Sequence, residues 1–255
     1  MPTTLADLLG GFEPIDLEAL DAQAALQRRV DHKYLVPPDA LESLLGRLRG
    51  GFRALEVAGV RASRYESVYF DTSELACFRD HVEDRLPRVK VRSRRYVETG
   101  DCVFEAKLKL RPGETVKESN DEACDDHGRV TPEARAFLER AVAPRAPRLD
   151  LDDLAPTLTT SYRRGTLGAR EGSERVTLDD ELVLTAPSGA RASLSADRVL
   201  VESKSEDGDA EADRVLRDAG FEPVSLSKYR AGIGLLVGGA PPPELARLFT
   251  TEAGG

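Results

Sequence analysis

The chain has 255 residues, of which 40% are hydrophobic and 32% are charged, and this balance excludes an intrinsically disordered protein. The formal net charge of -9 argues against a general nucleic-acid binder. No apolar run approaches the roughly 18 residues that a membrane span needs. We therefore expect a soluble globular protein that is long enough to bury an ordinary core.

The first 25 residues read as a short amphipathic leader without the regions of a signal peptide, and no function is assigned to them. The chain has three cysteines, Cys77, Cys102 and Cys124. Their number is odd and no CxxC spacing occurs, so neither a disulfide framework nor a zinc site is expected. A reducing cytoplasm is the simpler interpretation. The three histidines lack ligand spacing, and we expect them to be structural or exposed.

Strand-like and helix-like segments alternate along the first half of the chain. Strands are predicted at 28–37, 66–72, 88–97, 102–111 and 114–123, and helices at 37–48, 73–84 and 131–143. The strands 88–97 and 102–111 read as a hairpin, because Gly100 between them suits a tight turn.

The second half begins with a Pro/Arg connector at 144–156, which is more readily a loop within one domain than a domain boundary. Strands are then predicted at 157–170, 174–185, 191–195 and 197–205, followed by a helix at 207–220 and a last short helix near 223–236. Long antiparallel-type strands with helices between them predict an α+β fold, with a barrel as one possible form.

Positive charge is concentrated in residues 85–111, which hold nine Arg or Lys and three Asp or Glu. Alternate positions carry it in both hairpin strands, as Arg88, Lys90, Arg92 and Arg94, and then Glu105, Lys107, Lys109 and Arg111. Side chains at alternate positions share one face of a strand. The same spacing recurs as Arg29/Asp31/Lys33, Arg175/Thr177/Asp179 and Glu202/Lys204.

Two interpretations fit these charged faces. An antiparallel sheet with one wet face alternates apolar and charged residues as a matter of course. Like charges opposite each other repel, however, and the other faces are rich enough in Val, Leu, Phe and Ala to form the core. The charged faces would then surround a cavity that a polyanion fills. Phosphate chains suit Arg and Lys, and Glu105 and Glu202 suit a divalent metal held against the phosphate.

Eight segments in order resemble the VTC (polyphosphate polymerase) domain of the CYTH-like triphosphate tunnel superfamily. They are RRVDHKYLV, SVYFDT, RVKVRSR, FEAKLK, SYRR, RVTLDDEL, LVESK and SLSKY. The resemblance covers about residues 26–238, between the leader 1–25 and a tail 239–255. It implies an antiparallel β-barrel tunnel of about eight strands with helices packed outside. It also implies phosphoryl transfer from ATP to polyphosphate with Mn²⁺ or Mg²⁺.

The resemblance further implies roles for individual residues. Catalytic phosphate contacts fall on Lys33, Arg92, Arg94, Lys107, Arg164, Lys204 and Lys228. Further phosphate contacts fall on Arg88, Lys90, Lys109, Arg175, Ser227 and Tyr229. Metal ligation falls on Glu202, with Glu105 as a second acidic position. In SYRR the motif favours Arg164 over Arg163.

One departure bears on the reaction. Hydrolytic tunnel enzymes open with an ExExK strand, whereas this chain has Arg29 in place of the first glutamate. That favours polymerisation, but a tunnel triphosphatase and a non-catalytic polyphosphate or nucleotide sensor remain alternatives. The expected partners are ATP, triphosphate or polyphosphate, without nucleic acid. A membrane protein that receives the product is another conceivable partner, and the oligomeric state is left open.

Overall fold

The computed structural model describes residues 4–23, 30–239, 241 and 243–254. Contacts along the chain divide it into two compact units, each assembled from separated segments. Unit 1 comprises Met1–Arg64, Tyr162–Leu182 and Leu194–Leu226, and unit 2 comprises Tyr65–Ser161, Val183–Ser193 and Ser227–Gly255. The long strands β4, β8 and β9 contribute residues to both units. The predicted connector 144–156 lies inside unit 2, as a loop would.

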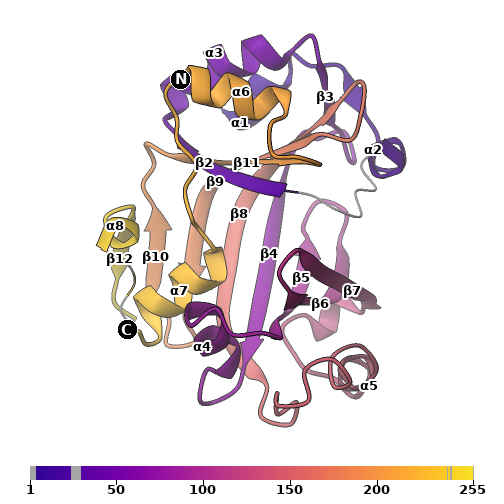
Figure 1. Cartoon of the computed structure of the whole chain (residues 1–255), viewed down its shortest axis with the longest axis vertical. Coiled ribbons are helices and arrows are strands. Elements are labelled where there is room, and N and C mark those ends of the chain that lie inside the picture. The colour runs from indigo at the N-terminus through magenta and orange to yellow at the C-terminus, as the bar shows by residue number, and fades with distance from the viewer. Residues whose placement is uncertain (1–3, 24–29, 240, 242, 255) are drawn as a thin grey trace. The chain divides into compact units, whose positions relative to one another are not determined.

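Unit 1 is a small, mostly antiparallel sheet with most of its helices packed on one face (Figure 1). Its strands are β1 (Pro14–Ile15), β2 (Val30–Val36), β3 (Phe52–Leu55), β11 (Val199–Ser205) and parts of β8 (Ala155–Ala169) and β9 (Arg175–Thr185). Its helices are α1 (Leu5–Leu9), α2 (Leu17–Gln23), α3 (Pro38–Leu48) and α6 (Glu211–Asp218). Strand β11 pairs with β2 and with β9, and β3 pairs with β1 and β8.

The core of unit 1 explains why its helices form where they do. Leu41, Leu44, Leu45 and Leu48 recur at helical spacing on one face of α3, and all four are buried. They pack with Val215 and Leu216 of α6 and with Tyr34 and Val201 from the sheet. Leu5 and Leu9 of the predicted leader are buried in the same core, so this segment is part of unit 1.

Unit 2 is built around a longer antiparallel sheet in the order β12-β10-β9-β8-β4-β5-β6-β7. Besides parts of β8 and β9, its strands are most of β4 (Ala62–Asp71), β5 (Arg88–Tyr96), β6 (Asp101–Arg111), β7 (Glu114–Glu122), most of β10 (Arg191–Leu194) and β12 (Phe249–Glu252). Its helices are α4 (Ala76–Val82), the 3-10 helix η1 (Cys124–Asp126), α5 (Pro132–Ala141), α7 (Lys228–Leu236) and α8 (Pro243–Ala246). Within the described residues this order has two ends and does not close on itself.

One face of the β5–β6 hairpin forms the core of unit 2. Val89 and Val91 of β5 and Phe104, Ala106 and Leu108 of β6 are buried against α5. Phe137 and Leu138 of α5 are likewise buried, and the Phe104 and Phe137 rings meet edge to face. Because side chains alternate along a strand, the charged residues of β5 and β6 lie on the opposite face.

The predicted α+β class, with mostly antiparallel strands and helices on the outside, is confirmed. The hairpin runs from 88–96 to 101–111, with Gly100 at φ 74° in the turn. The structure adds the short strands β1, β3 and β12, the last within the predicted tail. Arg29 and the start of the strand predicted at 28–37 lie outside the described residues. No helix in the described ranges is both long and apolar enough to cross a membrane.

The cysteine prediction was wrong. Cys102 of β6 and Cys124 of η1 form a disulfide, with their Cα atoms 5.3 Å apart. The β6–β7 ladder pairs Cys102 with Glu122, so the chain returns two residues later beside its partner. The odd number of cysteines gave the wrong expectation because Cys77 is a buried free thiol that takes no part in the disulfide.

Candidate phosphate-binding site

In unit 1 the site residues lie on the sheet face opposite α3 and α6. The ladder between β2 and β11 places Lys33 directly opposite Glu202. Lys33 Nζ lies 3.4 Å from Glu202 Oε1, and Lys204 Nζ lies 2.9 Å from Glu202 Oε2. Each oxygen of this carboxylate therefore faces its own ammonium group. Lys204 also donates to Thr177 Oγ1 at 3.2 Å.

These charges control one another's ionisation. Burial would raise the pKa of Glu202, but Lys204, Lys33 and Arg164 together lower it well below its usual range. Burial lowers the pKa of Lys204 to about 8, although Glu202 acts against that shift. At neutral pH the cluster therefore holds an ionised carboxylate between two ammonium groups, one of which titrates at unusually low pH.

Arg164 brings a further cation to this face. Its guanidinium makes a two-pronged pair with Asp179, with Nε–Oδ1 at 2.6 Å and Nη2–Oδ2 at 2.7 Å. Burial would lower the pKa of Arg164, but Asp179 outweighs it and raises that pKa. Arg163, one residue earlier, pairs with Asp180 and Glu181 instead. The alternation along β8 thus explains why only Arg164 joins Glu202.

In unit 2 the charged face of the hairpin is centred on Glu105. Its side chain is only 2% exposed, and it pairs with Arg92 Nε at 2.5 Å and with Lys117 of β7. Burial would raise its pKa, but Arg92, Arg94 and Lys117 lower it to about 2. Glu105 is thus a permanently ionised carboxylate that orders the cations around it.

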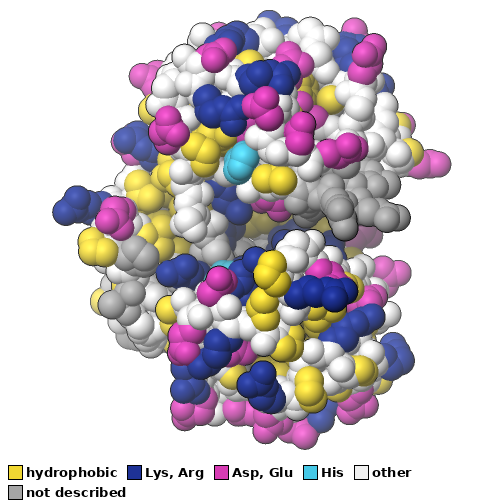
Figure 2. Space-filling view, viewed as in Figure 1, with side chains coloured by type: hydrophobic (Ala, Val, Ile, Leu, Met, Phe, Trp, Pro, Cys, Tyr) yellow, Lys and Arg dark blue, Asp and Glu magenta, His cyan; other side chains and the backbone are white. Residues whose placement is uncertain are grey.

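The other cations of the hairpin share this face. Lys90 lies opposite Lys107 and Arg88 lies opposite Lys109 in the ladder, an arrangement in which like charges repel. Arg94 Nε donates to Ser67 Oγ at 3.1 Å, and its guanidinium lies over the Tyr65 ring. On the molecular face shown in Figure 2, by contrast, Lys and Arg lie interspersed with Asp and Glu over the outside of each unit. The hairpin face is therefore unusual in how strongly its cations outnumber its carboxylates.

The start of α7 supplies Ser227, Lys228 and Tyr229. Ser227 caps the helix by accepting from Arg230 N at 3.3 Å, and it accepts from Lys90 Nζ at 3.1 Å. Lys228 is the first residue of α7. Tyr229 is buried, and its hydroxyl donates to Asp71 Oδ2, so its position favours a structural role.

Two other side chains are held by partners within their own unit. Asp71 accepts backbone bonds from Thr72, Cys77 and Phe78 at 2.8–2.9 Å, so it caps the turn into α4. Arg175 Nη2 donates to Asp21 Oδ1 at 2.8 Å in α2. Arg175 is thus drawn toward α2, whereas Lys33, Glu202 and Lys204 meet one another.

Sequence reasoning assigned no role to Lys117 or Asp179, although both complete ion pairs in the site. Lys117 lies opposite Lys107 in the β6–β7 ladder, and its charge reaches Glu105 diagonally. The alternation of Thr115, Lys117 and Ser119 on β7 is the signal that identifies it. Asp179 shares its face with Thr177, which the same rule places beside Glu202.

Among the described residues, no group of three or more His, Cys, Asp or Glu side chains is arranged to hold a metal ion. The fit to a divalent ion therefore depends on the ligand. Mg²⁺ is commonly bound through one or two carboxylates together with substrate phosphates and waters. Glu202, ionised and on the basic face, fits that mode, and Glu105 offers the same chemistry in unit 2.

Basic side chains around one ionised carboxylate on a mostly antiparallel sheet form the kind of surface that suits phosphate groups. The sequence profile of the VTC domain matches residues 28–237. The chain belongs to the VTC domain family. No curated protein matches the sequence.

Solved structures show similarity at low sequence identity. A candidate adenylate cyclase from Vibrio parahaemolyticus is 13% identical, with a TM-score of 0.47 over 79% of this chain and 95% of that one. A candidate adenylate cyclase from Bacillus halodurans is 14% identical, with a TM-score of 0.49 over 78% and 94%. A candidate adenylyl cyclase from Hippeastrum, described as having a dominant triphosphatase activity, is 16% identical, with a TM-score of 0.47 over 81% and 95%.

Proposed function

We propose that this protein is a metal-dependent phosphotransferase that extends polyphosphate with the γ-phosphate of ATP. Membership of the VTC domain family supports a triphosphate substrate. The observation that carries the proposal is the Lys33–Glu202–Lys204 cluster, in which two ammonium groups flank one ionised carboxylate. Cations alone would serve polyphosphate binding, whereas an ionised carboxylate among them suits a metal held against the phosphate.

In this proposal the chain's side chains act by position and charge. Arg92, Arg94 and Arg164 offer planar donors to phosphate oxygens, and Lys33 and Lys204 offer point charges. The attacking group is a terminal phosphate that is already anionic, so no general base is needed. The cations neutralise charge that develops on the transferred group.

A bound Mn²⁺ or Mg²⁺ would supply Lewis-acid stabilisation of the phosphate oxygens. Glu202 would hold it, because its pKa lies well below its usual range and it is ionised at neutral pH. Removing one of the lysines or arginines should raise the barrier by on the order of 2–4 kcal/mol, as for other preorganised donors.

The experiment is incubation with ATP and Mn²⁺ followed by analysis of the products. Wild type should form long phosphate chains, and Glu202→Gln should form them at least about a hundredfold more slowly. Glu206→Gln is the matched control, since Glu206 is an exposed carboxylate just after β11. Free orthophosphate as the only product would replace polymerisation by triphosphate hydrolysis. Tight binding without turnover, unaffected by Glu202→Gln, would identify a sensor.

The ligands and the cellular location of the protein are proposed as well. We propose ATP and polyphosphate as the ligands and, on sequence grounds, a cytoplasmic location. The Cys102–Cys124 bond weighs against that location, because disulfides are rare in a reducing cytosol. Redox labelling of the two thiols in intact cells would decide between an oxidised and a reduced state.

A further inference from the structure

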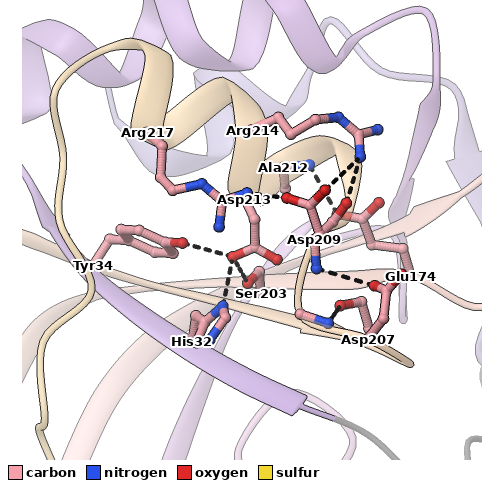
Figure 3. A network of polar contacts seen from close by, with 12 residues as sticks. His32, Tyr34, Glu174, Ser203, Asp207, Asp209, Ala212, Asp213, Arg214 and Arg217 are labelled. Atoms are coloured by element: carbon pink, nitrogen blue, oxygen red, sulfur yellow. Dashed lines mark hydrogen bonds and ion pairs between the residues drawn. The ribbon is translucent and has the colours of Figure 1, made fainter.

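A buried carboxylate lies on the helix side of the unit 1 sheet, away from the phosphate-binding face. Asp213 of α6 is 0% exposed, and Figure 3 shows three side chains of the sheet pointing at it. Its Oδ1 accepts from Tyr34 Oη at 2.6 Å and from Ser203 Oγ at 2.6 Å, and it lies 3.2 Å from His32 Nδ1. His32 and Tyr34 belong to β2, whereas Ser203 belongs to β11.

Each of these partners is a chain neighbour of a residue in the candidate site. Lys33 lies between His32 and Tyr34, and Ser203 lies between Glu202 and Lys204. The ladder pairs Ser203 with His32 on one face, one residue along from the pair of Glu202 with Lys33 on the other. Asp213 therefore contacts both strands on the sheet face opposite the Lys33–Glu202 pair.

Apolar packing alone would not fix this register. The core-side neighbours of β2 and β11 are Val and Tyr side chains, and apolar contacts are non-directional. The apolar pattern opposes a shift of one residue, which would turn every side chain of a strand to the other face, but a shift of two residues keeps each side chain on its face. Hydrogen bonds are directional, and one acceptor shared by two strands is satisfied in one register only. A buried carboxylate is costly without such partners, so its presence calls for a role.

We propose that Asp213 is a positioning residue for the phosphate-binding face. Acting as a shared hydrogen-bond acceptor, it holds β2 and β11 in the register that sets Lys33 and Lys204 on either side of Glu202. Its effect on ligand binding rests on the proposed function, whereas its effect on the two strands does not.

The geometry of the carboxylate selects the variants. All three partners meet Oδ1, whereas Oδ2 is buried without a hydrogen-bond partner among the described residues. An asparagine keeps one oxygen acceptor, so Asp213→Asn should preserve the contacts with β2 and β11. Asp213→Ala should abolish them. Glu174→Ala is the matched control, because Glu174 precedes β9 and bonds to the same helix. Glu174 accepts from Glu211 N and Ala212 N at the start of α6 but does not contact β2 or β11 in this network.

The test combines calorimetric titration with inorganic tripolyphosphate and Mg²⁺ at low salt with hydrogen exchange of the two strands. Asp213→Ala should bind tripolyphosphate on the order of ten- to a hundredfold more weakly, since small displacements of positioned groups have effects of that size. Its amides in 30–36 and 199–205 should exchange faster. Asp213→Asn should remain within about threefold of wild type in affinity. Glu174→Ala should lower stability without either effect.

The outcomes distinguish the positioning role of Asp213 from the proposed function of the protein. Equal losses in Asp213→Ala and Glu174→Ala would show that α6 acts only as structural support, and would overturn the positioning role. Normal exchange and affinity in Asp213→Ala would overturn it as well. No binding of tripolyphosphate by wild type would overturn the proposed function instead. In that case exchange in β2 and β11 still decides whether Asp213 holds the register.

Discussion

Lys204 is the side chain of the candidate site whose charge is most sensitive to pH. Burial lowers its pKa to about 8, and Glu202 holds it from falling further. An anion binds the protonated form, so affinity for tripolyphosphate should fall on the order of tenfold as the pH rises through about 8. Calorimetric titration of wild type and Lys204→Arg across this range measures the effect.

The comparison isolates Lys204 because tripolyphosphate titrates equally with both proteins. An arginine stays protonated throughout, so its affinity should change with pH only as the ligand and the remaining groups dictate. An identical decline in both proteins would show that Lys204 does not carry the pH dependence.

His127 provides a pH-dependent contribution to the stability of unit 2. Burial lowers its pKa, but Glu122 and Glu66 outweigh burial and raise it to about 9 from the ordinary 6.5. Its stabilisation should therefore be fully present below pH 6.5 and be lost as the pH rises through about 9. The side chain is 10% exposed, and the loss should be about 2–3 kcal/mol. Urea unfolding of wild type and His127→Gln measures it.

The free energies of unfolding of the two proteins should converge as the pH rises. The variant should be less stable than wild type at low pH and approach it above pH 9, since the charge it lacks is then absent from both proteins. Parallel stability curves would contradict the assignment. His127 is close to Ser93 as well, at 2.5 Å from Nδ1 to Oγ. Ser93 lies between Arg92 and Arg94, so the same variant also probes the order of that strand.

Two glycines in unit 1 have opposite effects on their elements. A Cβ at Gly165 of β8 would lie 2.3 Å from Leu9 Cδ1, because α1 packs directly on that strand. Gly46 is exposed in the last turn of α3, with nothing within 4 Å of a Cβ. Gly165→Ala should lower the free energy of unfolding by about 1–3 kcal/mol. Gly46→Ala should raise it by about 0.5–1 kcal/mol. Denaturant unfolding of both variants provides the measurement.

These two changes control for each other, since both add one methyl group to unit 1. Destabilisation by Gly46→Ala would mean that α3 does not have the exposed face described here. A neutral Gly165→Ala would mean that α1 can withdraw from β8 at little cost.

Most elements were predictable from the sequence because their side chains repeat with a clear period. The four buried leucines of α3 and the alternating cations of β5 are examples. Strands β1, β3 and β12 were not predicted because each has four residues or fewer, and so short a segment seldom shows a clear repeating pattern. The disulfide escaped because cysteine pairing depends on the β6–β7 register, which composition does not encode.

The sequence predicted the cations of the candidate site better than it predicted the residues that contact and support them. Alternation and the family motifs identified Lys33, Glu202 and Lys204, which the structure brings together. Asp213 falls within the helix predicted at 207–220, and it lies in the first turn of α6. Its contacts with β2 and β11 join residues up to 181 positions apart in the chain, and local sequence patterns do not report such distances.

At the scale of the whole molecule, each unit carries a basic sheet face with an ionised carboxylate, Glu202 in one and Glu105 in the other. We predict that the cations of each face contribute to the binding of tripolyphosphate. Lys33→Ala tests the face of unit 1 and Arg92→Ala tests the face of unit 2, since each variant removes one cation. Calorimetric titration should find affinity on the order of tenfold weaker in each variant than in wild type.

Both variants should fold, because neither side chain belongs to an apolar core: Lys33 is 28% and Arg92 is 23% exposed. Unchanged affinity in one variant would mean that the removed cation does not contact the ligand. The basic face of that unit would then lose its place in the proposed phosphate transfer.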